Sequence, residues 1–475
     1  MNNNEYSLDI ILITFFSLTM LIMCGTVLRK LFPVLAKAHL PASVIGGLVG
    51  LAIAPSAFGN FIYPSLGIDN IITEIYAISK KLPSYLIVIV FAALMMGKHT
   101  PSLNKIFSKA STHLVVGYSI AWGHYIIGIL LAMFILVPFF DANILSSALI
   151  AIGFQGGYGT AAGLGGTYQS LGFGDGYDLA LGMATAGKVL SIMMGLILIN
   201  IAVKMEKLSS PHQKKKEDTQ SDVPQEHAKS IFKKMRREKY FSADALILHF
   251  AILCVAIAIG WVLLKGLFFV ETFFLENEQD GFVQYIPLFP MALIGGIILQ
   301  IILNKKHLTR HVNAHYLHSI SHSFLDLLIV AAIASLSLKT IIANWQILAI
   351  LISVGIVWNL CMCFLIAPWV YRSSPWTKAL GDFAHSTGAA TTALMIMKIS
   401  DPADKTGAKT SFNFKQPLYE PIVGGGIITA LSMPLIHTIG ALNTLYIFTG
   451  LFVATIIIGL IILRVKKSNP ILKTK

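Results

Sequence analysis

Two segments rich in glycine and hydroxyl residues interrupt an otherwise apolar chain, at residues 144–172 and 377–398. The first polar segment, 144–172, contains the run Gly153-Phe-Gln-Gly-Gly-Tyr-Gly-Thr160. Consecutive glycines unwind a helix and expose peptide groups that lipid cannot satisfy, so such a backbone must line a cavity. A half-helix beginning there would direct its N–H groups at an anion. We therefore predict anion contacts from Gln155, Gly156, Gly157, Tyr158, Gly159 and Thr160.

The second polar segment, 377–398, places a carboxylate, an imidazole and hydroxyls where lipid favours leucine. The candidate ligand contacts here are Ser386, Thr387, Gly388, Thr391 and Thr392, and the candidate ion or proton ligands are Asp382 and His385. Either segment alone is equally well explained by small residues that let helices pack closely. Their equivalent positions in the two halves of the chain favour a shared binding function.

Five histidines recur at steps of three and four residues and so share one face of a helix: His307, His311, His315, His318 and His322. This histidine stripe is a candidate to bind a divalent metal or to sense internal pH, because imidazole titrates near neutrality. The alternative is the polar face of a helix at the membrane interface. The four cysteines lack histidine at metal spacing, so we expect neither zinc nor disulfides, and no cofactor.

The composition of the chain is that of a membrane protein. Hydrophobic residues make up 55% of it and charged residues 12%, too few to cover a water-soluble fold. The formal charge of +13 comes from Lys and Arg that lie between apolar runs, which argues against nucleic-acid binding. We predict an all-α polytopic protein surrounded by membrane lipid.

Apolar runs approach the roughly 20 residues that a helix needs to cross the hydrocarbon core. They lie near 7–28, 40–59, 82–97, 112–137, 176–203, 244–266, 283–303, 319–338, 344–369, 419–440 and 443–463. Between 204 and 239, eleven Lys or Arg stand against six acids, which predicts a cytoplasmic linker. The other basic loops lie on the cytoplasmic side only if each polar segment enters and leaves the membrane from the same side, as a re-entrant hairpin. The N-terminus is then outside and the C-terminus cytoplasmic.

Each half of the chain then has five spans and one re-entrant broken hairpin, and the odd number gives the halves opposite orientations. The predicted units are a first inverted repeat at 1–203, a charged linker at 204–243, a second repeat at 244–440 and an extra span with a basic tail at 441–475. Sequence echoes support the repeat, since Ile45-Gly46-Gly47-Leu48 corresponds to Ile294-Gly295-Gly296-Ile297.

Four motifs make the sequence resemble the sodium/glutamate symporter family of bacteria. They are Leu40-Pro-Ala-Ser-Val-Ile-Gly-Gly47, Gln155-Gly-Gly-Tyr-Gly-Thr160, Gly182-Met-Ala-Thr-Ala-Gly187, and the second polar segment with Pro421-Ile-Val-Gly424. The resemblance implies an elevator-like, homodimeric carrier in the inner membrane that imports L-glutamate with sodium. Relatives have a glycine-rich run where this chain has His385, Ser386 and Thr387 before Gly388. That departure favours, as an alternative, a carrier for another small carboxylate or anion with altered ion coupling.

Lys188 is a second departure, because family members generally carry an apolar residue there. It lies eleven residues into the run that begins at Tyr177, too deep to reach either interface comfortably. Its ammonium could pair with the substrate carboxylate, take the place of a sodium ion, or form a buried ion pair. Glu420, which begins the corresponding helix of the second half, is either its partner or a helix cap.

Two other classes of membrane protein fit the sequence less well than a carrier. A membrane-embedded enzyme needs a nucleophile with a base, or a metal signature, within its spans, and neither stands out. A channel does not require two opposed hairpins in inverted repeats, which are what alternating access uses. The sequence therefore predicts a transporter and not an enzyme.

Overall fold

The computed structural model describes residues 8–32, 35, 40–97, 103–206, 243–274, 281–306, 308, 312–371 and 373–468. Within these ranges the regular elements are all helical. The predicted linker from 207 to 242, the tail from 469 and the histidines His307 and His311 lie outside them. The first half contains α1 (Leu8–Leu31), α3 (Ala42–Ala52), α4 (Gly59–Leu66), α5 (Asp69–Ala93), α6 (Leu103–Leu131), α7 (Val137–Phe140), α8 (Gly157–Gly163), α9 (Gly165–Ser170) and α10 (Gly176–Glu206). The second contains α13 (Ala243–Phe274), α14 (Leu288–Lys305), α15 (Ala314–Ala334), α16 (Leu338–Ala343), α17 (Trp345–Cys361), α18 (Ala367–Val370), α19 (Pro375–Gly388), α20 (Ala390–Ser400), α21 (Ala408–Tyr419), α22 (Ile427–Ile439) and α23 (Ala441–Ser468).

Nine helical stretches of the described residues are long and apolar enough to cross a membrane, which makes this a multi-pass membrane protein. Two predicted spans are shorter than expected. The run at 40–59 forms only the 11-residue α3, and the run at 419–440 forms only the 13-residue α22. Glycines at 424–426 separate α22 from α21, because Gly425 takes φ 93°, outside the helical region. The run at 82–97 belongs to a longer helix, α5, which continues through Pro83.

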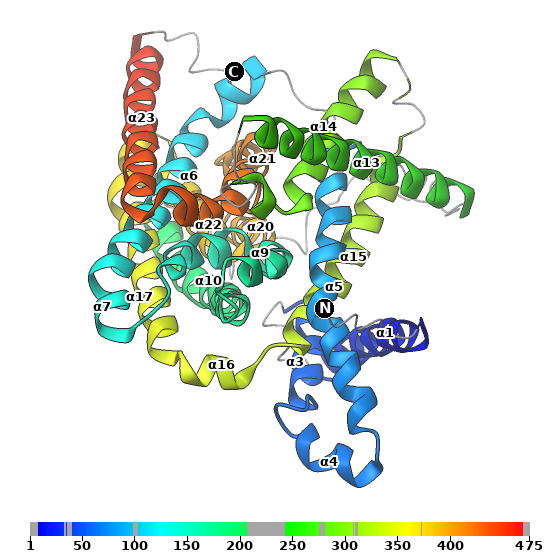
Figure 1. The fold of residues 1–475 in the computed structure, drawn as a ribbon. Coiled ribbons are helices and arrows are strands. Elements are labelled where there is room, and N and C mark those ends of the chain that lie inside the picture. The colour runs from blue at the N-terminus through cyan, green and yellow to red at the C-terminus, as the bar shows by residue number, and fades with distance from the viewer. Residues whose placement is uncertain are drawn as a thin grey trace, which may run out of the picture.

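The long helices form two groups, of which the first lies to the right and the second to the left in Figure 1. The scaffold group consists of α1, α3, α5, α13, α14 and α15, which pack on one another. The second group consists of α6, α10, α17 and α19 to α23. α8 packs against α5 and α15 on one side and α10 on the other. An ion pair also joins the groups, since Lys80 Nζ of α5 lies 3.1 Å from Asp178 Oδ2 of α10.

The two echoing glycine pairs make matching helix contacts. A Cβ at Gly46 would lie 2.3 Å from a backbone oxygen of α1, and one at Gly295 would lie 2.1 Å from a backbone oxygen of α13. The following glycine of each pair faces the other half, because Gly47 meets a side chain of α15 and Gly296 meets the backbone of α5. Only glycine allows these close approaches.

The two long helices that precede the polar segments also end alike. α6 passes into a π-helical turn, η1 (Ala132–Leu136), and then α7, whereas α17 passes into η7 (Met362–Ile366) and then α18. Each short helix carries a proline in its first turn, where the missing N–H costs no helical hydrogen bond. In both halves, therefore, the polar segment begins directly after the same sequence of helical turns.

Candidate functional site

The first polar segment unwinds directly after Gln155. It consists of η2 (Ile144–Ala148), η3 (Ala151–Gln155), α8 and α9, and Gly157 takes φ 61° where α8 begins. Gln155 is 3% exposed, and neither its Nε2 nor its Oε1 has a hydrogen-bond partner among the described residues. Leaving a buried polar group unpaired costs about 1–3 kcal/mol. Both the donor and the acceptor of the Gln155 amide are therefore available to a polar group that the described residues do not supply.

The predicted glycines of this segment do not share one role. A Cβ at Gly159 would lie 2.9 Å from Ile87 of α5, so this glycine allows α8 to pack closely on the scaffold group. Gly157 has open space on its side-chain face and is required instead by its positive φ. Gly156 and Tyr158 flank it, and Tyr158 is buried. Close packing thus explains one glycine, and the break in the helix explains another.

The second polar segment is a pair of packed helices, α19 and α20, broken at Ala389. Ala389 takes φ 85° and ψ 162°, a region that normally requires glycine and costs a residue with a Cβ about 1–3 kcal/mol. The hydroxyls of Ser386 and Thr387 donate to carbonyls one turn earlier in α19. Asn359 of α17 donates to Thr387 Oγ1 over 2.9 Å. These two predicted ligand hydroxyls are therefore satisfied within the protein.

The two polar segments meet on α10. η3 packs against α19, and both lie against the middle of α10. A Cβ at Gly187 would lie 2.3 Å from the carbonyl oxygen of Thr387 and 2.7 Å from the ring of Phe154. Gly187, the last residue of the Gly182–Gly187 motif, therefore lets both broken segments lie close against α10.

The break between α21 and α22 completes this junction. Thr160 Oγ1 donates to the carbonyl oxygen of Gly425 over 2.9 Å. A Cβ at Gly425 would lie 2.4 Å from Thr160 Oγ1 and 3.0 Å from the Cα of Gly156. The backbone of Gly425 thus lies directly against the Thr160 hydroxyl and the Gly156 backbone, which leaves no room for a side chain at position 425.

Substituting Gly425 with alanine should therefore displace the first polar segment. Gly440→Ala is the matched control, because Gly440 has φ 84° but open space around its Cβ position. Both variants incur the strain of a positive φ, and only Gly425→Ala adds overpacking, which costs about 1–3 kcal/mol more. Denaturant unfolding of both purified variants measures this difference. Equal losses of stability would show that the close contact at Gly425 is unimportant.

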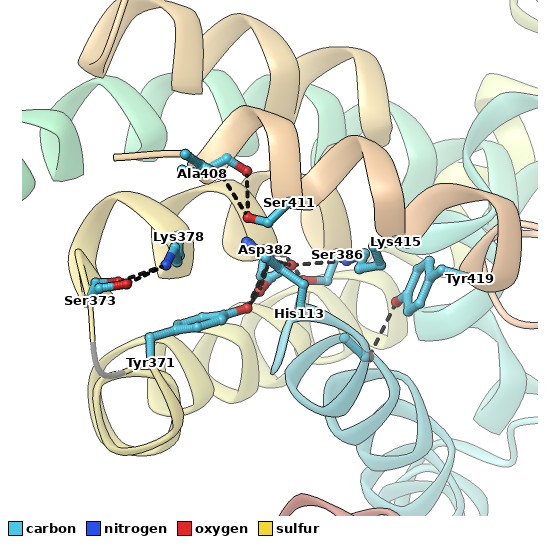
Figure 2. A network of polar contacts seen from close by, with 12 residues as sticks. His113, Tyr371, Ser373, Lys378, Asp382, Ser386, Ala408, Ser411, Lys415 and Tyr419 are labelled. Carbon is cyan, nitrogen blue, oxygen red and sulfur yellow. Dashed lines mark hydrogen bonds and ion pairs between the residues drawn. The ribbon is translucent and has the colours of Figure 1, made fainter. Parts of the chain in front are cut away.

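A buried polar network holds the second polar segment in place, as Figure 2 shows. Lys415 Nζ of α21 lies 2.9 Å from Asp382 Oδ1 of α19. His113 Nδ1 of α6 lies 3.1 Å from Asp382 Oδ2, and the hydroxyl of Tyr371 donates to the same oxygen. Each of these four side chains is at most 2% exposed. Both carboxylate oxygens of Asp382 are thus occupied by groups of the protein.

Sequence reasoning did not find the partners of Asp382. Lys415 is 1% exposed, and its ammonium lies 4.1 Å from the ring centroid of Tyr419. The available signal was the spacing, since Lys415 and Tyr419 stand one helical turn apart in α21. His113 carried no local signal, because it lies 269 residues from Asp382 in the sequence. Tyr371 precedes Asp382 by 11 residues and lies outside α19, so helical spacing does not relate the two.

The remaining predicted charges have other partners than expected. Glu420 Oε1 lies 3.1 Å from His385 Nε2, so it pairs with the second polar segment and not with Lys188. Lys188 Nζ contacts Thr392 Oγ1 at 2.6 Å, and Thr391 Oγ1 and the carbonyl oxygen of Gly388 lie nearby. Lys188 and Glu420 therefore both contact the second polar segment, but through different residues of it.

The described part of the histidine stripe forms no metal centre. The rings of His318 and His322 meet edge to face, with centroids 4.1 Å apart and an interplanar angle of 75°. Among the described residues, no group of three or more His, Cys, Asp and Glu side chains could hold a metal ion. His315 also lies on α15, and the two remaining members of the stripe, His307 and His311, fall outside the description.

Comparison with known proteins gives one match. The family model described as sodium/glutamate symporter matches residues 6–400, which include both polar segments, Gln155, Lys188 and the Asp382 carboxylate. No curated protein and no solved structure matched the chain.

Proposed function

The chain belongs to the sodium/glutamate symporter family, and we propose from this membership that it imports L-glutamate together with sodium. The observation that carries the proposal is the buried Gln155 amide, whose two polar atoms lack protein partners. Glutamate offers carboxylate acceptors for Nε2 and an ammonium donor for Oε1. Gln155 also directly precedes the broken helix that the family resemblance assigns to the substrate.

The substrate site proposed here lies where the two polar segments and α10 meet. The candidate contacts are Gln155 to Thr160 in the first segment and Ser386 to Thr392 in the second. Among them the Gln155 amide is the strongest candidate, because the hydroxyls of Thr160, Ser386, Thr387, Thr391 and Thr392 already have protein partners. His385 is a further candidate, because its Nδ1 is buried and has no partner among the described residues. Asp382 contributes by holding α19 in position, since its oxygens are already occupied. Sodium is the proposed coupling ion.

We further propose that the halves are inverted repeats, 1–203 and 244–440, with 204–243 as linker and 441–475 as an added span. The matching glycine pairs support this, because each pair joins equivalent helices in its own half and in the other. The π-helical turns before both polar segments support it as well. The orientation follows from the basic loops, with the N-terminus outside and the C-terminus in the cytoplasm.

An elevator-like movement would carry the α10 side of the molecule past the scaffold group. The division into two groups supports this mechanism, as does the position of the first polar segment between them. The Lys80–Asp178 ion pair would have to break during such a movement. The family resemblance also implies a homodimer within the inner membrane.

Uptake of labelled L-glutamate into proteoliposomes tests the proposed function. We expect uptake with an inward sodium gradient and none when potassium replaces sodium, because the gradient supplies the driving force. Competition with unlabelled dicarboxylates and hydroxy acids then defines the substrate. Folded protein that takes up a different carboxylate, but not glutamate, would establish the alternative carrier instead.

A further inference from the structure

The ammonium of Lys188 lies within a set of oxygen atoms that all belong to the second polar segment. Its Nζ is 2.6 Å from Thr392 Oγ1, 3.2 Å from Thr391 Oγ1 and 3.4 Å from the carbonyl oxygen of Gly388. A lysine ammonium has three N–H donors, and here there are three oxygen acceptors. Lys188 therefore has no donor left for a substrate carboxylate.

These oxygens lie at the C-terminal end of a half-helix. Gly388 is the last residue of α19, and the chain breaks at Ala389 before α20 begins. The C-terminal end of a helix carries a partial negative charge and unpaired carbonyl groups, so it attracts a cation. Carbonyl and hydroxyl oxygens at such half-helix ends are also the ligands that coordinate sodium in broken-helix carriers.

The helix that carries Lys188 fits closely against this half-helix. Ser191, almost one turn further along α10, donates from Oγ to the carbonyl oxygen of Ala384 over 2.9 Å. A Cβ at Gly388 would lie 2.5 Å from the Cβ of Ser191. Close packing on both sides of Lys188 therefore fixes its side chain against the end of α19. Among the described residues, no carboxylate forms an ion pair with it.

We propose that the Lys188 ammonium occupies a monovalent cation site, and that this site binds sodium when the ammonium is removed. In this protein the Lys188 ammonium thus takes the place of one bound sodium ion. The consequence for coupling rests on the proposed sodium-driven transport: the protein uses one sodium ion fewer per cycle than it would without Lys188. The cation site itself does not depend on the identity of the substrate.

Sodium binding to purified variants tests the site without transport. Lys188→Ala empties the oxygen set, and Lys188→Met removes the charge but keeps much of the volume. The matched control is Lys204→Ala, an exposed lysine on the same helix. We expect sodium chloride, compared with choline chloride, to raise the melting temperature of Lys188→Ala more than that of wild type, Lys188→Met or Lys204→Ala. An equal response in all four proteins would overturn the proposal.

Uptake measurements give the second readout. In Lys188→Ala the Hill coefficient for sodium should rise by about one, because one more ion binds in each cycle. If wild type shows no glutamate uptake but Lys188→Ala gains sodium-specific stability, the cation site stands and the transport proposal fails. If Lys188→Ala does not fold, Lys188→Ser is purified separately in sodium chloride and in choline chloride. Folded protein in sodium chloride alone supports the cation site, and unfolded protein in both salts contradicts it.

Discussion

Replacing Asp382 with asparagine is expected to lower the free energy of unfolding by about 3–5 kcal/mol, because it leaves the Lys415 ammonium buried without a counter-charge. His113 and Tyr371 cannot replace the lost counter-charge, because a neutral histidine and a neutral tyrosine carry no negative charge. The loss should also release α19, because this network joins it to α6 and α21. Denaturant unfolding in detergent micelles measures the effect.

The double variant Asp382→Asn/Lys415→Met separates the charge from the packing. It removes both members of the ion pair and keeps similar volumes, so most of the lost stability should return. Lys409→Met, on the same helix but outside the network, controls for substituting a lysine of α21. A double variant as unstable as the single one would mean that the ion pair itself is not what holds the second polar segment.

Replacing Gln155 with leucine is expected to weaken glutamate binding on the order of a hundredfold. The estimate follows from losing two hydrogen bonds to charged groups, each worth about 1.5 kcal/mol or more. The same change should preserve or raise the stability of the substrate-free protein, because it removes a buried amide that lacks protein partners. The concentration dependence of uptake, and unfolding without substrate, measure these two effects.

Gln169→Leu is the matched control for Gln155. Gln169 lies in α9 of the same polar segment, and it is exposed. We expect this substitution to leave both the affinity and the stability nearly unchanged. If Gln155→Leu lowers stability while its apparent affinity for glutamate stays normal, the amide has a structural role and the substrate is bound elsewhere.

The composition and the spacing of apolar runs determined that this is a multi-pass helical membrane protein. Most spans appear close to their predicted positions because lipid requires long, continuous apolar helices. The exceptions, α3 and α22, are shorter because glycines and prolines near their ends prevent a continuous helix even where the side chains stay apolar. Hydropathy alone does not distinguish a continuous apolar helix from an apolar run that is broken by glycine or proline.

The sequence also determined where the backbone would break, because glycine runs and polar residues in apolar surroundings are local signals. The breaks at Gly157 and Ala389 lie within the two predicted polar segments. Only the tertiary structure decided how the charges pair. Asp382 is joined to His113, Tyr371 and Lys415, and Lys188 contacts the end of α19 rather than Glu420. Such pairings depend on which helix faces pack together, and residues on separate helices carry no local record of that choice in the sequence.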